Sequence, residues 1–348
     1  MKFRSETGDR KALIPKSGTA RAMRVSWGRH EVMLLWVVVA EVLFFSMAGR
    51  NFVTADNLAN IVRHSVEIGL LALVMLPVIL TGGIDLSVGS LLGLCAVLFG
   101  MLWRDAGWPW EGAALAALAF GAVGGAFNAA LITGLRLPPL IVTLGTYSLY
   151  RGLAEALTRG TDAFTRFPES FLFLGTGRWA GLPTQAWILL GVALVVGVCV
   201  HRMTWGRSWR AIGFSPEGAR HAGLPVERRV AGAYVLAGLV AALAALTYTA
   251  RLGTAKADAG TGYELAAITA VVLGGTSIFG GTGSMPGTLL GVAAIAVLTN
   301  GLGRVPATLS LAGELSGLLT GAVLLLALAG GSVARWRAEF RGWRRQRD

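Results

Sequence analysis

The amino-acid sequence predicts an all-α fold, a polytopic transmembrane helical bundle of about ten spans with both termini in the cytoplasm. Of its 348 residues, 54% are hydrophobic and only 14% are charged, whereas a soluble domain carries about 25% charged residues. Apolar runs close to the roughly 20 residues that a spanning helix needs recur along the chain. Lys and Arg collect beside these runs. A surface with so little charge is expected to face lipid.

The apolar runs predict where the spans lie. They fall near residues 31–48, 66–81, 84–102, 111–133, 138–157, 186–201, 230–250, 264–279, 285–303 and 309–330. The runs at 66–81, 138–157 and 264–279 are short or carry polar residues, which makes them candidates for broken or partly re-entrant helices. We expect a basic N-terminal segment (1–30), a single transmembrane domain (31–330) and a basic tail (331–348). The first run lacks a small-residue cleavage site and is interpreted as an uncleaved span.

The basic residues set the predicted orientation. Three patches, at 1–29, 202–229 and after 334, hold twenty of the thirty-one Lys and Arg residues. Such clusters mark cytoplasmic loops. Ten spans bring both termini to one side, and the 202–229 loop, which did not set the orientation, falls on that side too. Because these basic clusters flank apolar runs, cytoplasmic loops account for the net charge of +12. A nucleic-acid partner is therefore not predicted. The outer loop 158–185 is expected either to face a periplasmic partner or to lie on the lipid headgroups.

Polar residues interrupt the apolar runs in two similar places. Residues 81–90 (TGGIDLSVGS) join two spans and contain Asp85 and Ser87, either of which can cap the next helix. They form either a gate element of a pathway or a tight interhelical turn. Residues 272–284, with Thr276, weakly resemble them, and Asn128 and Asn300 each precede a Leu/Gly-Arg-x-Pro stretch. Matching glycine-interrupted segments in two halves indicate a substrate path at a repeat interface.

The predicted fifth span carries further polar residues inside an apolar segment. Thr143 and Tyr147 lie on it, and Arg151 and Glu155 are spaced to pair on one helix face. An ionisable group inside a bilayer costs several kcal/mol unless it is paired or hydrated. The mutual pair is therefore the simplest prediction for these two charges.

A short helix is predicted in the basic 202–229 loop. Ser215 suits its N-cap, Pro216 its first position, Glu217 its positive end, and Gly223 its stop. A helix of two turns is not stable alone in water. It must lie against the membrane surface or against a partner subunit.

Several chemistries lack their motifs. The chain has no phosphate-binding loop, no His-Glu-x-x-His motif and no Gly-x-Ser-x-Gly motif. Cys95 and Cys199 lie within apolar runs without ligand spacing, so no metal, disulfide or other cofactor is predicted. An intramembrane enzyme is disfavoured because no nucleophile–base pair is evident. An ion-coupled secondary transporter remains the alternative, and it would need an intramembrane ion site and would act alone.

Four stretches resemble the ribose-type permeases of ATP-binding-cassette importers. They are residues 82–90 (GGIDLSVGS), 140–146 (LIVTLGT), 259–265 (AGTGYEL) with 271–277 (VVLGGTS), and the loop 205–224. The resemblance implies about ten helices, no enzyme activity of its own, and residence in the bacterial inner membrane. It also implies three partners: a cytoplasmic ATPase pair, a second permease subunit, and a periplasmic sugar-binding protein. Within the family, the chain is most similar to permeases for rhamnose or for autoinducer-2, with those for ribose and other monosaccharides behind. The pieces 212–220 and 256–260 resemble the rhamnose type.

The resemblance also implies roles for particular residues. Glu217, Ala219, Arg220 and Gly223 are similar to the Glu-Ala-Ala-x-x-x-Gly element through which such permeases contact their ATPase, although Gly218 stands where that pattern has an Ala. A neutral sugar needs several weak hydrogen bonds along its path instead of one tight site. The path candidates are Asp85, Ser87, Asn128, Thr143, Tyr147, Thr276 and Asn300.

Overall fold

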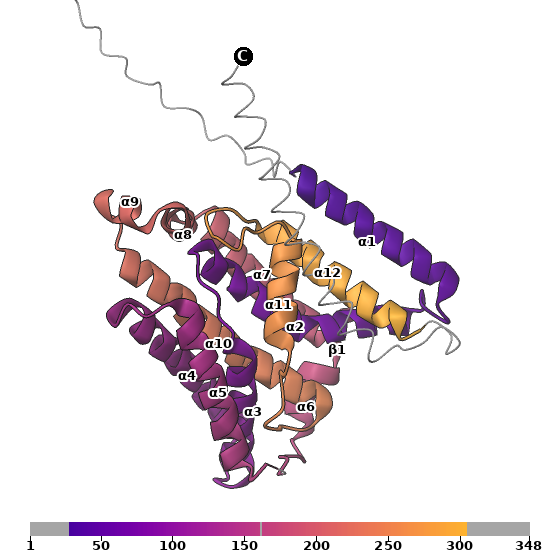
Figure 1. Ribbon diagram of the computed structural model, residues 1–348. Helices are drawn as coiled ribbons and strands as arrows, with labels where there is room; N and C mark the ends of the chain where they lie inside the picture. The colour runs from indigo at the N-terminus through magenta and orange to yellow at the C-terminus, as the bar shows by residue number, and fades with distance from the viewer. Residues whose placement is uncertain (1–27, 161, 305–348) are drawn as a thin grey trace, which may run out of the picture.

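The computed structural model describes residues 28–160 and 162–304, and they are mostly helical (Figure 1). The predicted tenth span (309–330), the basic residues 1–27 and the tail lie outside the described residues. The helices are α1 (Arg29–Ala48), α2 (Ala55–Leu80), α3 (Val88–Arg104), α4 (Trp110–Ala129) with the π-helical turn η1 (Ala130–Gly134), α5 (Pro139–Leu157), α6 (Glu169–Thr176), α7 (Thr184–His201), α8 (Thr204–Phe214), α9 (Pro216–His221), α10 (Val226–Leu252), α11 (Tyr263–Leu273) and α12 (Met285–Leu302). The strands β1 (Arg178–Trp179) and β2 (Leu182–Pro183) pair as a small antiparallel hairpin.

Six of the described helices are long and apolar enough to cross a membrane. They are α1, α2, α4 with η1, α7, α10 and α12. The apolar helices α3 and α11 are shorter, and α5 has 19 residues but carries polar side chains. The chain is therefore a multi-pass membrane protein, while the total of ten spans and the side on which the termini lie stay predictions.

The three segments predicted as short or broken behave differently. The run at 66–81 is the apolar end of α2, a helix of 26 residues capped by Thr54. Its first turns carry Asn57, Asn60 and Arg63, and these polar residues concealed its start. The segment 138–157 forms the unbroken helix α5. The segment 264–279 is broken, because α11 ends at Leu273 before Gly274 and Gly275.

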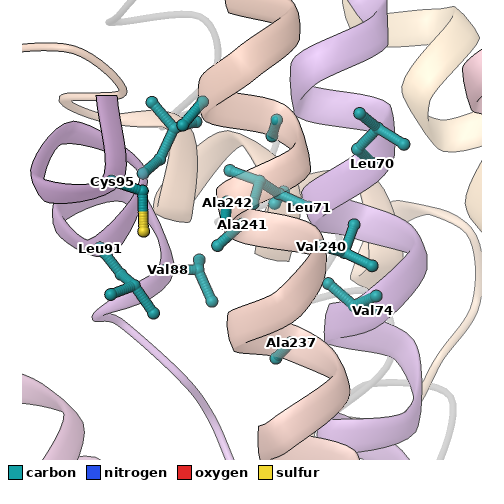
Figure 2. Packing of buried hydrophobic residues seen from close by; sticks show 14 of the residues in the cluster. Leu70, Leu71, Val74, Val88, Leu91, Cys95, Ala237, Val240, Ala241 and Ala242 are labelled. Carbon is teal, nitrogen blue, oxygen red and sulfur yellow. The ribbon is translucent and has the colours of Figure 1, made fainter. Parts of the chain in front are cut away.

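The core forms where α2, α3, α4 and α10 pack together. Leu71 and Val74 of α2 lie toward α10, while Val88, Leu91 and Cys95 of α3 lie on the other side of α10 (Figure 2). Glycines allow α4 and α10 to touch backbone to backbone: a Cβ on Gly238 would lie 2.1 Å from the carbonyl oxygen of Gly121. Lipid gives helices no hydrophobic drive to associate, so such close approach is what holds membrane helices together.

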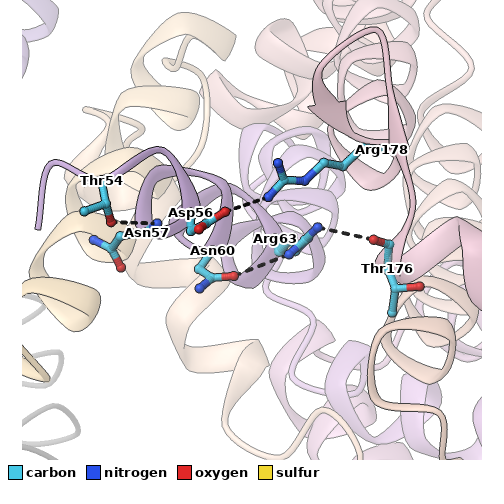
Figure 3. Close-up of polar contacts among 7 residues, drawn as sticks. All are labelled: Thr54, Asp56, Asn57, Asn60, Arg63, Thr176 and Arg178. Atoms are coloured by element: carbon cyan, nitrogen blue, oxygen red, sulfur yellow. Dashed lines mark hydrogen bonds and ion pairs between the residues drawn. The ribbon is translucent and has the colours of Figure 1, made fainter. Parts of the chain in front are cut away.

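The outer loop predicted at 158–185 folds back onto the bundle. Phe171 of α6 is fully buried, and its ring centroid lies 4.7 Å from that of Phe99 on α3. Arg178 forms a 2.9 Å ion pair with Asp56 at the start of α2, and Arg63 donates to the carbonyl of Thr176 (Figure 3). The rings of α3 and of this loop therefore bury one another, while the predicted contact of the loop with a periplasmic partner or with lipid headgroups stays a prediction.

Each end of the bundle has its own connections. The hairpin of α8 and α9 (residues 202–225) lies at the end where α2 and α7 finish and α10 and α12 begin, as Figure 1 shows. At the other end lie α6, the turn 49–54 and the loop 253–262. A substrate that crosses the bundle must pass from one of these ends to the other.

Candidate translocation and coupling sites

Three path candidates predicted from the sequence meet in one buried cluster. The Oδ1 atom of Asp85 accepts hydrogen bonds from the backbone N–H of Ser87 (2.9 Å) and from its hydroxyl (2.6 Å). The amide of Asn128, on α4, donates to the same Ser87 hydroxyl at 2.8 Å. All three residues are buried. The turn between α2 and α3 is thus tied to α4 by polar side chains at the end of the bundle that carries the hairpin.

A fourth candidate joins this cluster from α5. The hydroxyl of Thr143 donates to the carbonyl of Ile84 at 3.1 Å, so α5 is fastened to the same turn. Tyr147, one helical turn further along α5, is half-buried. The Oδ1 atom of Asn128 and the hydroxyl of Tyr234 are buried and have no hydrogen-bond partner among the described residues. The cluster therefore retains unused hydrogen-bonding capacity, a costly state in a low-dielectric interior.

Two tyrosines beside the cluster were not identified from the sequence. Tyr150 donates its hydroxyl to the carbonyl of Gly124 at 2.9 Å. A Cβ on Gly83 would lie 2.5 Å from the hydroxyl oxygen of Tyr234, so this glycine leaves room for that ring. A tyrosine inside an apolar run is a usable signal, because a buried phenol needs a partner, but the partner depends on the helix arrangement.

Thr276 lies in the second glycine-rich turn, residues 274–284. It is buried, and its hydroxyl has no hydrogen-bond partner among the described residues. Gly275, Gly280 and Gly281 have φ of +89°, +88° and +80°, in the left-handed region that favours glycine. The backbone N–H of Gly281 donates to the carbonyl of Leu80 at 3.0 Å. The two similar glycine-rich segments of the sequence are therefore neighbours in the fold.

Asn300 lies apart from the other candidates, at the opposite end of α2. Its amide and that of Asn57 exchange two hydrogen bonds, of 3.0 and 3.1 Å, across 243 residues of sequence. It also lines a cavity of about 690 Å³ between α2 and α12. The structure therefore groups Asp85, Ser87, Asn128 and Thr143, and it places Asn300 about the length of α2 away, roughly 39 Å for 26 residues.

The predicted pair of Arg151 and Glu155 does not form. The Arg151 guanidinium instead donates to the carbonyl of Ala257, and to that of Ala259 at 3.2 Å, in the loop before α11. The prediction considered only residues on the same helix face as Arg151. The sequence does not reveal that the carbonyls of the loop 253–262 lie next to that face. A buried ion pair was missed altogether: Arg251 Nε of α10 donates to Glu67 Oε1 of α2 at 2.8 Å.

The predicted helix of the 202–229 loop is confirmed as α9. The Ser215 hydroxyl accepts a 3.0 Å hydrogen bond from the N–H of Gly218, Pro216 is the first helical residue, and Gly223 ends the turn with φ +79°. Ala219 is buried in a small apolar cluster with Ile212 and Val226. This cluster fixes α9 to α8 and α10.

The charged residues of the hairpin divide into an exposed and an inward-facing set. Glu217 is exposed, and Arg220 forms an exposed 2.9 Å ion pair with Glu227. Arg210 of α8 points inward and donates to the carbonyls of Val200 (2.9 Å) and Gly283 (3.3 Å). Partial burial lowers the pKa of the Arg210 guanidinium from its ordinary value. Glu217 and Arg220 are thus exposed charged side chains of α9.

Within residues 28–160 and 162–304, no group of three or more His, Cys, Asp or Glu side chains could hold a metal ion. Cys95 and Cys199 are free thiols. The polar clusters described above retain buried hydrogen-bonding groups, and the hairpin carries exposed charged side chains.

Comparison with known proteins adds independent findings. The model of the family described as branched-chain amino acid transport system / permease component matches residues 57–328. The autoinducer 2 import system permease protein LsrD of Photorhabdus temperata is 35% identical over 329 residues, which cover 93% of this chain and 96% of that protein. LsrD of Escherichia coli K12 is 34% identical over 326 residues, with 92% and 97% covered. LsrD of Photorhabdus luminescens is 34% identical over 325 residues, with 92% and 95% covered.

Proposed function

Because the chain belongs to the permease-component family of branched-chain amino acid transport systems, we propose that it carries autoinducer 2, or a sugar of similar size and polarity, across the bacterial inner membrane. It acts as one membrane-spanning subunit of an ATP-driven importer. Relatives that match over most of their length are named as permeases for autoinducer 2 import. Rhamnose and ribose are the next candidates, since all three ligands are small and hydroxylated.

One observation carries this proposal: a short, sharply capped helix stands at the end of an exposed hairpin. A six-residue helix gains little stability from its own hydrogen bonds, yet α9 is fixed by a Ser cap, a Pro start, a Gly stop and a buried Ala219. Those features hold a rigid surface outward. Glu217, Arg220 and Gly223 on that surface are the proposed contacts with a cytoplasmic ATPase, which supplies the energy that this chain, without a phosphate-binding loop, does not obtain from ATP itself.

The proposed path runs past the turn between α2 and α3. Asp85, Ser87, Asn128 and Thr143 gather there, and unused hydrogen-bonding atoms remain beside them. Tyr147 and Thr276 are proposed to line the same inner part of the path, and Asn300 its outer part. Because Asp85, Ser87, Asn128, Thr143 and Thr276 are buried in the described conformation, they reach a sugar only when the helices rearrange. A second permease subunit, the same or homologous, forms the other wall, and a periplasmic sugar-binding protein delivers the sugar.

Reconstitution tests the proposal. The permease pair, its ATPase and its binding protein are placed in proteoliposomes with labelled autoinducer 2, rhamnose or ribose. ATP-dependent uptake of autoinducer 2, and none when the ATPase is omitted, is expected. Uptake by this chain alone under an ion gradient would instead establish a secondary transporter and overturn the assignment. ATP-dependent uptake of rhamnose or ribose only would correct the substrate and leave the permease role in place.

A further inference from the structure

Three glycines from distant segments meet backbone to backbone beside the hairpin. They are Gly82, which follows α2, Gly213 near the end of α8, and Gly280 in the turn between α11 and α12. A Cβ on Gly280 would lie 2.8 Å from the backbone nitrogen of Gly82 and 2.9 Å from the Cα of Gly213. Figure 1 shows the loop between α11 and α12 beside α8. We refer to Gly82, Gly213 and Gly280 as the glycine junction.

The glycine junction has no room for a side chain. A Cβ on Gly213 would lie 2.1 Å from the carbonyl oxygen of Leu80 and 2.3 Å from the nitrogen of Gly281. Both atoms belong to the backbone, so they cannot rotate away as a flexible side chain would. The other two members also require glycine for their conformation, since Gly82 has φ +83° and Gly280 has φ +88°. Segments packed this closely shift together or must separate.

Hydrogen bonds fasten the same segments. The N–H of Gly281 donates to the carbonyl of Leu80 at 3.0 Å, which joins the two glycine-rich turns to each other. One guanidinium N–H of Arg210 on α8 donates to the carbonyl of Val200, at the end of α7. Another donates to the carbonyl of Gly283 in the second turn. The planar guanidinium fixes both directions at once, which a lysine ammonium does not. α8 is thereby held to both turns by packing and by hydrogen bonds.

The other end of α8 passes directly into α9. Ser215 ends α8 and also caps α9, so no flexible residue separates the two helices. Ile212, which precedes Gly213, packs with Ala219 of α9 and Val226 of α10. A displacement of α9 is therefore passed to α8 without an intervening hinge.

We propose that α8 connects the ATPase-facing helix α9 to both glycine-rich turns, 81–87 and 274–284, so that all of them move as one rigid body. This proposal rests on the proposed function, and it assigns Gly213 and Arg210 as positioning residues. The first turn carries Asp85 and Ser87, and the second carries Thr276. The ATPase cycle thus displaces the polar groups of both halves of the path at the same time.

The first experiment separates ATP hydrolysis from transport. The complete complex is reconstituted with Gly213→Ala, with Arg210→Lys, or with Gly191→Ala as a control, because a Cβ on Gly191 in the membrane helix α7 meets nothing within 4 Å. Both test variants should retain ATP hydrolysis and lose autoinducer 2 uptake per ATP by about tenfold, a usual size for coupling between sites. The control should match the wild type. Equal uptake per ATP in all three variants would overturn the proposal.

A distance measurement tests the rigid-body movement directly. It is made on a complex that keeps Gly213, so it does not depend on whether the Gly213→Ala variant assembles. Spin labels are attached at His221→Cys on α9, Thr282→Cys in the second turn and Ser170→Cys on α6 at the opposite end of the bundle, all exposed positions, in a background without Cys95 and Cys199. The complex is measured without nucleotide and in a vanadate-trapped state. The 221–282 distance should stay constant while both distances to position 170 change. A nucleotide-dependent 221–282 distance would refute the proposal. Failure of the proposed function itself would be distinguishable, because the wild-type complex would show no ATP-dependent uptake and no distance would respond to nucleotide.

Discussion

Replacement of Arg251 by glutamine should destabilise the protein more than replacement of its partner Glu67. The two side chains form a 2.8 Å ion pair between α2 and α10, with 0% of the Glu67 side chain and 12% of the Arg251 side chain exposed. Removal of one member of a buried pair costs about 3–5 kcal/mol, because the other charge is left without compensation. Arg251→Gln leaves a wholly buried carboxylate whose second oxygen, Oε2, already has no hydrogen-bond partner among the described residues. The full cost of about 3–5 kcal/mol is therefore expected for this variant.

Glu67→Gln should cost less, about 1–3 kcal/mol. Arg251 keeps some exposure, and its guanidinium lies 5.5 Å from the ring centroid of Tyr248, which attracts a cation. The double variant Glu67→Gln/Arg251→Gln has no buried charge at this point and should be more stable than Arg251→Gln alone.

Denaturant titration of the purified protein in mixed micelles measures these differences as free energies of unfolding. A double-mutant cycle then gives the coupling energy of the pair, and contacting residues of this kind usually show about 0.5–3 kcal/mol. The reasoning is refuted if Arg251→Gln and Glu67→Gln each lie within about 0.5 kcal/mol of the wild type, the range of ordinary surface substitutions.

Three further outcomes follow from the structure. Glu217→Lys reverses the charge at an exposed position of α9 and should reduce the ATPase activity of the assembled complex. Membrane insertion, measured by cell fractionation, should be unchanged. Normal ATPase activity would remove Glu217 from the proposed docking surface. Tyr150→Phe loses a 2.9 Å hydrogen bond and should lower the unfolding free energy by about 0.5–1.5 kcal/mol. Tyr234→Phe removes a hydroxyl that has no hydrogen-bond partner among the described residues, so its effect on the unfolding free energy should be neutral or stabilising. A larger loss of stability for Tyr234→Phe than for Tyr150→Phe would contradict the assigned bonds. Gly238→Ala places a Cβ 2.1 Å from a carbonyl oxygen of α4 and should destabilise by about 1–3 kcal/mol, a loss that the same titration would detect.

The sequence predicted best what depends on neighbouring residues. The start and end of α9 follow from Ser215, Pro216 and Gly223, whose effects act within one helical turn, and the structure has all three in the predicted roles. The break after α11 follows likewise from Gly274 and Gly275. Local capping and backbone conformation need no knowledge of the fold, so these predictions did not depend on how the helices pack.

Contacts between distant helices could not be predicted in this way. Glu67 and Arg251 are 184 positions apart, and either charge could have reached a bilayer surface in a different helix arrangement. Arg151 had a candidate partner four residues away, but it donates instead to carbonyls in the loop before α11. The polar candidates separated for the same reason: Asn128 joined Asp85 through Ser87, whereas Asn300 found Asn57 at the far end of α2. The sequence shows which residues need partners, and helix packing decides which partners they find.

The departure from the family pattern at Gly218 has a local physical reason. The family element has an alanine at this position, but in this chain the Ser215 hydroxyl accepts a 3.0 Å hydrogen bond from the Gly218 N–H. A Cβ on Gly218 would lie 3.0 Å from that same hydroxyl oxygen, a tight contact that would shift the cap. Glycine lowers helix propensity by about 1 kcal/mol relative to alanine, and a serine cap is worth a similar amount. In this chain the Ser215 cap thus offsets the low helix propensity of Gly218, and α9 keeps the ordered, exposed surface that the proposed contact with an ATPase requires.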